Sequence, residues 1–165
     1  MAYHTIIIEN HSDVFKEFTA AATITPGMLV EQTPGAATLR KHATSGGNAR
    51  PMFAIEDTLQ GKGITDNYAE GDVVRTWIPG RGDIVYALIA DEQNIAIGDP
   101  LESNGAGFLT KHTVEAWNSA DAQVANTVYS FPVVGFALEA LDLSGLSTQG
   151  TSDAPLRQYM KVTIV

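Results

Sequence analysis

Short strand-forming runs that end at Pro-Gly or Gly-Asp pairs recur along most of the chain. Residues 23–25 alternate in polarity and end at a Pro-Gly pair, and residues 28–31 extend again before a second such pair at 34–35. Proline fixes φ and glycine accepts a positive φ, so these pairs end a strand and reverse the chain. Residues 84–90 are apolar on both faces, which is typical of a central strand. The pattern predicts a mainly β fold, either a compact β-barrel or a sandwich.

The two halves of the chain share three sequence matches that occur in the same order. Residues 24–31 match 95–102, residues 39–42 match 109–112, and residues 53–56 match 136–139. One explanation is that Ile-x-x-Gly-x-x-Leu is a common turn pattern in β proteins. The conserved order of the matches favours an internal duplication instead. It predicts one β-rich domain, residues 23–165, built from pseudo-repeats at about 23–82 and 83–165.

The first 22 residues precede these matches and are predicted to form an extended N-terminal arm. Residues 6–8 are three isoleucines, which favours a short strand. Residues 11–22 form a loop or a short helix, because Phe15 and Phe18 are three apart and can share a helical face. The arm either pairs within its own sheet or adds to a neighbouring subunit, and the sequence leaves both open. The candidate protein-interface residues are apolar side chains of this arm and one tryptophan in a polar, alanine-rich stretch: Ile6, Ile7, Ile8, Phe15, Phe18 and Trp117.

The chain is acidic, and the acid is concentrated in the second half. The formal net charge is −9, from 10 Lys and Arg against 19 Asp and Glu. Lys111 is the one base among residues 83–156. Such a surface repels phosphate backbones and anionic lipids, so we expect no nucleic-acid partner and no membrane partner. Residues 6–8 are too short for a signal core or a membrane span. We therefore expect the protein to stay on the cytoplasmic side unless it leaves inside a larger particle.

Motifs that would carry catalysis are absent from the sequence. There is no cysteine, no Gly-x-Ser-x-Gly, no phosphate-binding loop and no His-Glu-x-x-His, and the four histidines lie at no ligand spacing. The sequence therefore predicts no enzymatic activity, no catalytic residue, no cofactor and no metal site. Residues 81–83 spell Arg-Gly-Asp, which some adhesion receptors recognise, although Gly-Asp is also ordinary turn chemistry.

The order of motifs in the second half resembles that of a known family. The motifs are residues 82–90, Ile-Ala-Ile-Gly-Asp-Pro-Leu-Glu at 95–102, Gly-Phe-Leu-Thr at 107–110, Val-Gly-Phe-Ala-Leu-Glu-Ala at 134–140, and a closing strand at 159–165. This series resembles the capsid decoration proteins of tailed bacteriophages, also called cement or head-stabilising proteins, over roughly residues 70–165.

The resemblance implies a structural virion protein without catalytic residues. Its partners would be the major capsid protein and itself, as a dimer or trimer, and it would stabilise the head across capsomer junctions. Its location would be the capsid surface of the virion, after synthesis in the bacterial host cytoplasm. The alternative function is a phage head fibre or an adhesion or receptor-binding module.

Overall fold

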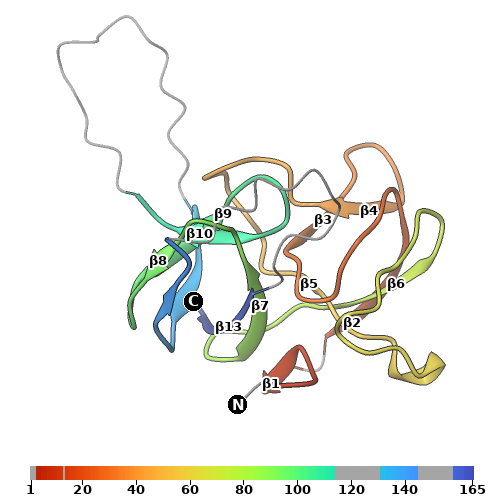
Figure 1. Ribbon diagram of the computed structural model, residues 1–165. Coiled ribbons are helices and arrows are strands. Elements are labelled where there is room, and N and C mark those ends of the chain that lie inside the picture. Colours follow the sequence, from red (N-terminus) through yellow and green to blue (C-terminus); the bar gives the residue numbers. More distant parts are fainter. Residues whose placement is uncertain (1–2, 13, 114–130, 145–157) are drawn as a thin grey trace, which may run out of the picture.

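The fold is mainly β, as the turn pattern predicts. A computed structural model describes residues 3–12, 14–113, 131–144 and 158–165. In this part of the chain the strands form two barrels that lie side by side (Figure 1). The helical element of the described residues is one short 3-10 turn, η1 (Thr58–Gln60). The sequence also predicts a strand at residues 125–130, which lie outside the described residues.

The C-terminal barrel is a closed sheet of five strands. Its strands are β7 (Ile84–Ile89), β9 (Pro100–Ser103), β10 (Leu109–Lys111), β11 (Val133–Ala137) and β13 (Gln158–Ile164). They follow the order β7-β10-β9-β11-β13, and β13 pairs back with β7 to close the barrel. The edge of β7 also carries β1 (Ile7–Glu9), while β8 (Asn94–Ile95) and β12 (Leu141–Asp142) form a separate two-stranded ribbon.

The N-terminal barrel is built from the five strands that lie between β1 and β7 in the chain. They are β2 (Phe15–Ala20), β3 (Val30–Gln32), β4 (Thr38–Lys41), β5 (Phe53–Ala54) and β6 (Val73–Trp77). Their order is β3-β4-β2-β6-β5. The two ends of this sheet are joined by backbone hydrogen bonds, from the Val30 N–H to the Met52 oxygen at 2.9 Å and from the Ala54 N–H to the Met28 oxygen at 3.1 Å.

The two barrels share strand order, strand direction and register. In chain order, the five strands of one correspond to the five of the other, and β2–β4 is the parallel pair of the first as β7–β10 is of the second. Val30 pairs with Lys41 as Leu101 pairs with Lys111. Three backbone hydrogen bonds recur at equivalent positions: Ala21 to Leu39 and Ala90 to Leu109, His42 to Leu29 and His112 to Pro100, and Ile55 to Arg75 and Leu138 to Lys161.

These correspondences contain the three sequence matches, each on equivalent strands. A gene duplication that produced the two barrels stays a prediction, supported by this shared register. Each barrel is filled by the inward side chains of equivalent strand positions, as period-two alternation requires. The interior residues include Ala20, Val30, Leu39 and Val74 in the first barrel and Ile89, Leu101, Leu109 and Met160 in the second.

Two expectations about local structure need correction. The helix considered for residues 11–22 is wrong at residues 15–20, which form strand β2, with Phe18 and Ala20 facing inward as a strand pattern allows. The sequence Pro-Gly-Arg-Gly at 79–82 also predicts a hairpin between the strands on either side of it. That hairpin is wrong, because β6 and β7 belong to different barrels. That turn carries the chain from one barrel to the other. The division into an arm, residues 1–22, and a domain, residues 23–165, stays a prediction, and β2 of the first part is the central strand of the N-terminal sheet.

Candidate interaction surfaces

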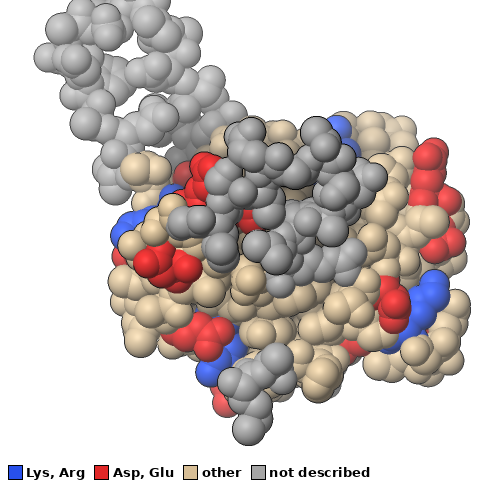
Figure 2. Space-filling model, viewed as in Figure 1, with Lys and Arg blue, Asp and Glu red and all other residues tan. Residues whose placement is uncertain are grey.

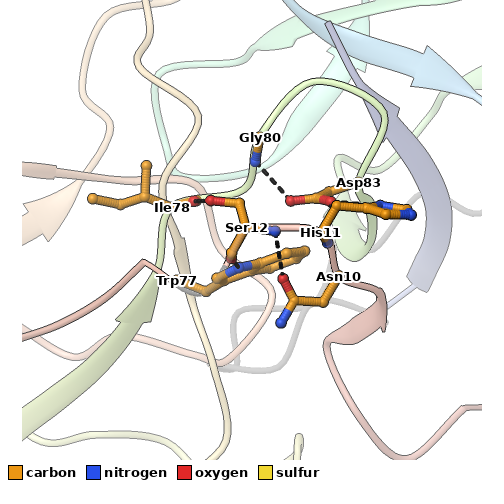
Figure 3. Close-up of polar contacts among 7 residues, drawn as sticks. All are labelled: Asn10, His11, Ser12, Trp77, Ile78, Gly80 and Asp83. Carbon is orange, nitrogen blue, oxygen red and sulfur yellow. Dashed lines mark hydrogen bonds and ion pairs between the residues drawn. The ribbon is translucent and has the colours of Figure 1, made fainter.

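Residues 10–12, which connect β1 to β2, make polar contacts that hold the N-terminal segment against both barrels. The Trp77 indole N–H donates to the Ser12 backbone oxygen at 2.8 Å, and the Ser12 hydroxyl donates to the Ile78 oxygen at 3.3 Å. The Asn10 side chain accepts from the Ser12 N–H at 2.9 Å. Figure 3 shows these residues gathered beside the turn that links β6 to β7. The segment is therefore held at the point where the chain crosses between the barrels.

Asp83 is the buried acceptor at the centre of this cluster. Its side chain is 0% exposed, and its carboxylate accepts from the His11 N–H at 2.6 Å and the Gly80 N–H at 2.7 Å. The His11 ring nitrogen Nδ1 lies 3.0 Å from the same carboxylate (Figure 3). Burial by itself raises the pKa of this carboxyl, but the hydrogen bonds from Gly80 and His11 outweigh it and lower the pKa below its usual range.

Asp83→Ala is expected to destabilise the fold in a pH-dependent way. The substitution leaves the Gly80 and His11 N–H groups without their acceptor, which costs about 1–3 kcal/mol. Because the folded pKa is lowered, the contribution of Asp83 is present above about pH 4 and is lost as the pH falls below it. The free energies of unfolding of parent and variant, measured in urea between pH 7 and pH 3, should therefore differ less as the pH is lowered.

His11→Ala serves as the matched control for that comparison. It removes a side chain that is 72% exposed but keeps the backbone N–H that donates to Asp83. We expect the free energy of unfolding to fall much less than in Asp83→Ala. Equal losses would mean that the ring, and not the two backbone donors, holds the carboxylate.

The burial of Asp83 also bears on whether the Arg-Gly-Asp tripeptide at residues 81–83 can bind an adhesion receptor. An adhesion receptor needs the aspartate carboxylate at the surface, whereas the Asp83 carboxylate is buried and bonded to its own chain. Asp83 performs the turn role that Gly-Asp chemistry also allows. In this structure the tripeptide is not available as an adhesive tip.

The predicted interface residues fall into three groups. Ile6 is fully buried in the core of the C-terminal barrel, and its N–H donates to the Glu56 carboxylate at 3.1 Å. Ile6 therefore offers no surface to a partner. Ile7, Ile8 and Phe18 are half-buried, and Phe15 is 45% exposed. Trp117 lies outside the described residues. The roles of the exposed and half-buried residues at an interface, and the reach of residues 1–22 toward a neighbouring subunit, stay predictions.

The barrels contact each other through a face of β7 and β13 and a turn of the N-terminal barrel. The Leu88 N–H donates to the Gly27 oxygen at 3.0 Å. The Tyr159 hydroxyl, which has one proton to donate, lies 2.8 Å from the Ile64 backbone oxygen and 3.2 Å from the Pro26 backbone oxygen. The Tyr159 ring stacks on Tyr86 with centroids 5.1 Å apart. This contact makes the two barrels one packed body.

Exposed apolar side chains gather on the C-terminal barrel, and sequence reasoning missed them. Ile97 is 70% exposed, Phe136 37%, Leu138 38% and Val165 43%. Phe136 and Leu138 flank the buried Ala137 on β11 and after it, so the alternation of a half-buried strand was a usable signal. Their match to Phe53 and Ile55 in the first half was a second signal. Apolar residues grouped in this way are typical of a protein-binding surface.

Two glutamate–histidine pairs occupy equivalent places in the barrels. His42 is buried, with Nε2 3.8 Å from Glu31 and Nδ1 2.7 Å from the Ser103 hydroxyl. His112 contacts Glu102 through Nδ1. Each histidine therefore joins its own barrel's glutamate and not the other histidine. Among the described residues, no group of three or more His, Cys, Asp or Glu side chains is arranged to hold a metal ion.

On the face of the molecule seen in Figure 2, the charged side chains of the described residues lie in small groups. Figure 2 shows acidic side chains on both sides of the molecule, several of them next to a Lys or Arg, with uncharged surface between them. In the described part of the chain, acids pair with Lys or Arg in Arg40–Glu31 at 2.8 Å, Lys111–Asp99 at 2.7 Å and Lys161–Glu139 at 3.7 Å. The view gives no continuous acidic field. Within the described residues, no helix has the length and apolarity to span a bilayer.

Comparison with known proteins gives a likeness to a solved structure. No family model matches the chain, and no curated protein matches it. Among solved structures, it is similar to the crystal structure of the N base of head fiber gp8.5 in bacteriophage phi29. The sequence identity is 14% and the TM-score 0.50, and the alignment covers 92% of this chain and 93% of that chain. The likeness shows that the two chains share a fold along nearly their whole length.

Proposed function

We propose that this chain is a non-enzymatic structural protein of a tailed-phage head that binds the outer surface of the assembled major capsid protein. The observation that carries the proposal is the fold shared along 92% of this chain with the base of a phage head fibre. It is consistent with the motif order of residues 70–165, which resembles capsid decoration proteins. The chain would stabilise the head across capsomer junctions and reside on the virion surface, after synthesis in the host cytoplasm.

The architecture suits a clamp that works by buried area. The two barrels are packed together, and the N-terminal segment is hydrogen-bonded to both through Asp83, Trp77 and Glu56. A clamp needs stiffness and apolar contact surface but no reactive group. The acidic net charge of −9 favours neither nucleic acid nor anionic membrane as a partner.

A capsid-binding experiment tests the proposal. Heads assembled without this chain should bind the purified protein to saturation in co-sedimentation, at a fixed ratio to the major capsid protein. Saturated heads should release their DNA at a higher temperature than bare heads, measured with a DNA-binding dye. Absence of co-sedimentation at saturating protein would overturn the proposal.

A head-fibre base is the second candidate, and it is favoured because the similar solved structure is itself the base of a phage head fibre. The two candidates share capsid binding but differ in its consequence. A decoration protein would occupy many equivalent capsid positions and raise the temperature of DNA release. A fibre base would bind at lower copy number and leave that temperature unchanged. Electron microscopy of saturated heads would count the copies directly.

A further inference from the structure

The contact between the two barrels within one chain has two unlike sides. On the N-terminal barrel it uses a surface that we call face A, made of Pro26, Gly27, Leu29, Phe53 and Ile55, all of them buried. On the C-terminal barrel it uses a surface that we call face B, made of Tyr86, Leu88 and Tyr159. Because the two faces are different parts of the same repeated fold, the contact is head to tail.

The shared register places an equivalent of face A on the C-terminal barrel. Phe136 pairs with Pro100 and Thr163 as Phe53 pairs with Leu29 and Trp77. The Gly98 N–H donates to the Ala137 oxygen at 2.8 Å, as the Gly27 N–H donates to Ala54 at the same distance. The second face A therefore consists of Ile97, Gly98, Pro100, Phe136 and Leu138.

Face A is buried in the N-terminal barrel, whereas its equivalent on the C-terminal barrel is exposed. Phe53 and Ile55 are 0% and 4% exposed beneath the other barrel, whereas their equivalents Phe136 and Leu138 are 37% and 38% exposed. A β-carbon at Gly27 would lie 2.7 Å from the Tyr159 ring, but one at Gly98 would meet no atom within 4 Å. The second face A thus has the apolar composition of an interface and nothing from the described residues packed over its turn.

An equivalent of face B lies on the N-terminal barrel and is also exposed. Leu88 pairs with Tyr159 as Thr19 pairs with Val73, so Thr19 and Val73 occupy the matching positions. Val73 is 55% exposed, and Thr19 is exposed opposite it. Glu17, two residues before Thr19 on β2, occupies the position of Tyr86 and is also exposed. Each chain therefore carries one free face A at its C-terminal barrel and one free face B at its N-terminal barrel.

We propose that the free face A of one chain binds the free face B of a second copy, repeating between chains the contact that joins the two barrels within a chain. Unlike faces that bind head to tail generate a closed ring or an open row, according to the rotation between copies. The inference is independent of capsid binding. It explains why Phe136 and Leu138 are exposed although their equivalents Phe53 and Ile55 are core residues.

The contact between copies would be weaker than the one within the chain, for two reasons in the sequence. Pro100 stands where Leu29 donates its N–H to the Gly107 oxygen at 2.8 Å, so that hydrogen bond has no counterpart. Thr19 stands where Leu88 supplies an apolar side chain, and Glu17 stands where Tyr86 supplies a ring. We therefore expect association that depends on protein concentration.

Two single variants and their mixture test this inference by sedimentation velocity. Phe136→Asp destroys the free face A and Val73→Asp destroys the free face B, and each is expected to weaken self-association by about tenfold or more. Mixed in equal amounts, the two variants retain one intact A–B pair. They should form a 1:1 complex that grows no further, whereas each alone stays monomeric.

Leu59→Asp is the control, because Leu59 is 84% exposed in η1 and belongs to neither face. It should associate like the parent chain. Circular dichroism checks that each variant is folded. Ile97→Asp and Thr19→Asp, at exposed positions of the same two faces, replace any variant that is not.

Three outcomes would overturn the inference: a parent chain that stays monomeric at its highest soluble concentration, association that survives both variants, or a mixture that forms no complex. None of them depends on the head. Capsid binding that persists in Phe136→Asp would leave the proposed function standing, and loss of capsid binding with intact self-association would leave this inference standing.

Discussion

Replacing Trp77 by alanine is expected to lower the free energy of unfolding by about 3–5 kcal/mol, the cost of truncating a large buried aromatic residue. The Trp77 side chain is fully buried and belongs, with Phe53 and Ile55, to the cluster that continues from the barrel contact into the interior of the C-terminal barrel. Its indole N–H also holds the Ser12 oxygen at 2.8 Å. One substitution therefore opens a cavity at the barrel contact and releases the N-terminal segment.

Trp77→Phe separates these two contributions. Phenylalanine keeps much of the ring packing but has no N–H for the Ser12 oxygen, so we expect a loss of about 1–2 kcal/mol. Chemical unfolding gives both values, and proteolysis within residues 1–14 under native conditions reports release of the segment. Equal losses for the alanine and phenylalanine variants would show that the hydrogen bond, and not the packing, dominates.

Much of the fold was predictable because turn chemistry and strand alternation are local. Residues 84–90 read as a central strand, and β7 occupies 84–89 with neighbours on both sides. Barrel closure was not predictable from local pattern, since it depends on pairing between residues far apart, such as Val85 with Val162. Phe15 and Phe18 were misread for a related reason. Their spacing fits one helical face, and only the pairing of β2 with β6 decides for a strand.

The interaction surface was less predictable than the fold. Phe136 and Phe53 have the same sequence context, yet one is exposed and the other is fully buried. Phe53 is buried because the C-terminal barrel packs over it, whereas Phe136 is not covered in this way. Local sequence does not encode how the two barrels pack against each other. Asp83 shows the same limit, because Arg-Gly-Asp reads as an exposed tip until the N–H groups of His11 and Gly80 are found around its carboxylate.

The second large effect is expected from Gly27→Ala, measured against Gly98→Ala. Both glycines have a positive φ, 89° and 86°, in equivalent turns, so both variants bear a strain of about 1–2 kcal/mol. Only at Gly27 does the new β-carbon meet a neighbour, 2.7 Å from the Tyr159 ring and 3.2 Å from the Tyr86 oxygen. Overpacking adds about 1–3 kcal/mol there. The difference between the two unfolding free energies isolates the contact between the barrels.

The expected clash in Gly27→Ala depends on a fixed Tyr159 ring, because a ring free to rotate would relieve it. The ring is held at both ends, by contacts of its hydroxyl with the Pro26 and Ile64 oxygens and by stacking on Tyr86. A double-mutant cycle with Tyr159→Ala, run where the chain is monomeric, checks this point. Tyr159→Ala should recover part of the loss in Gly27→Ala and none of the loss in Gly98→Ala. Equal recovery in both would mean that Tyr159 acts on the whole fold and not on the Gly27 turn.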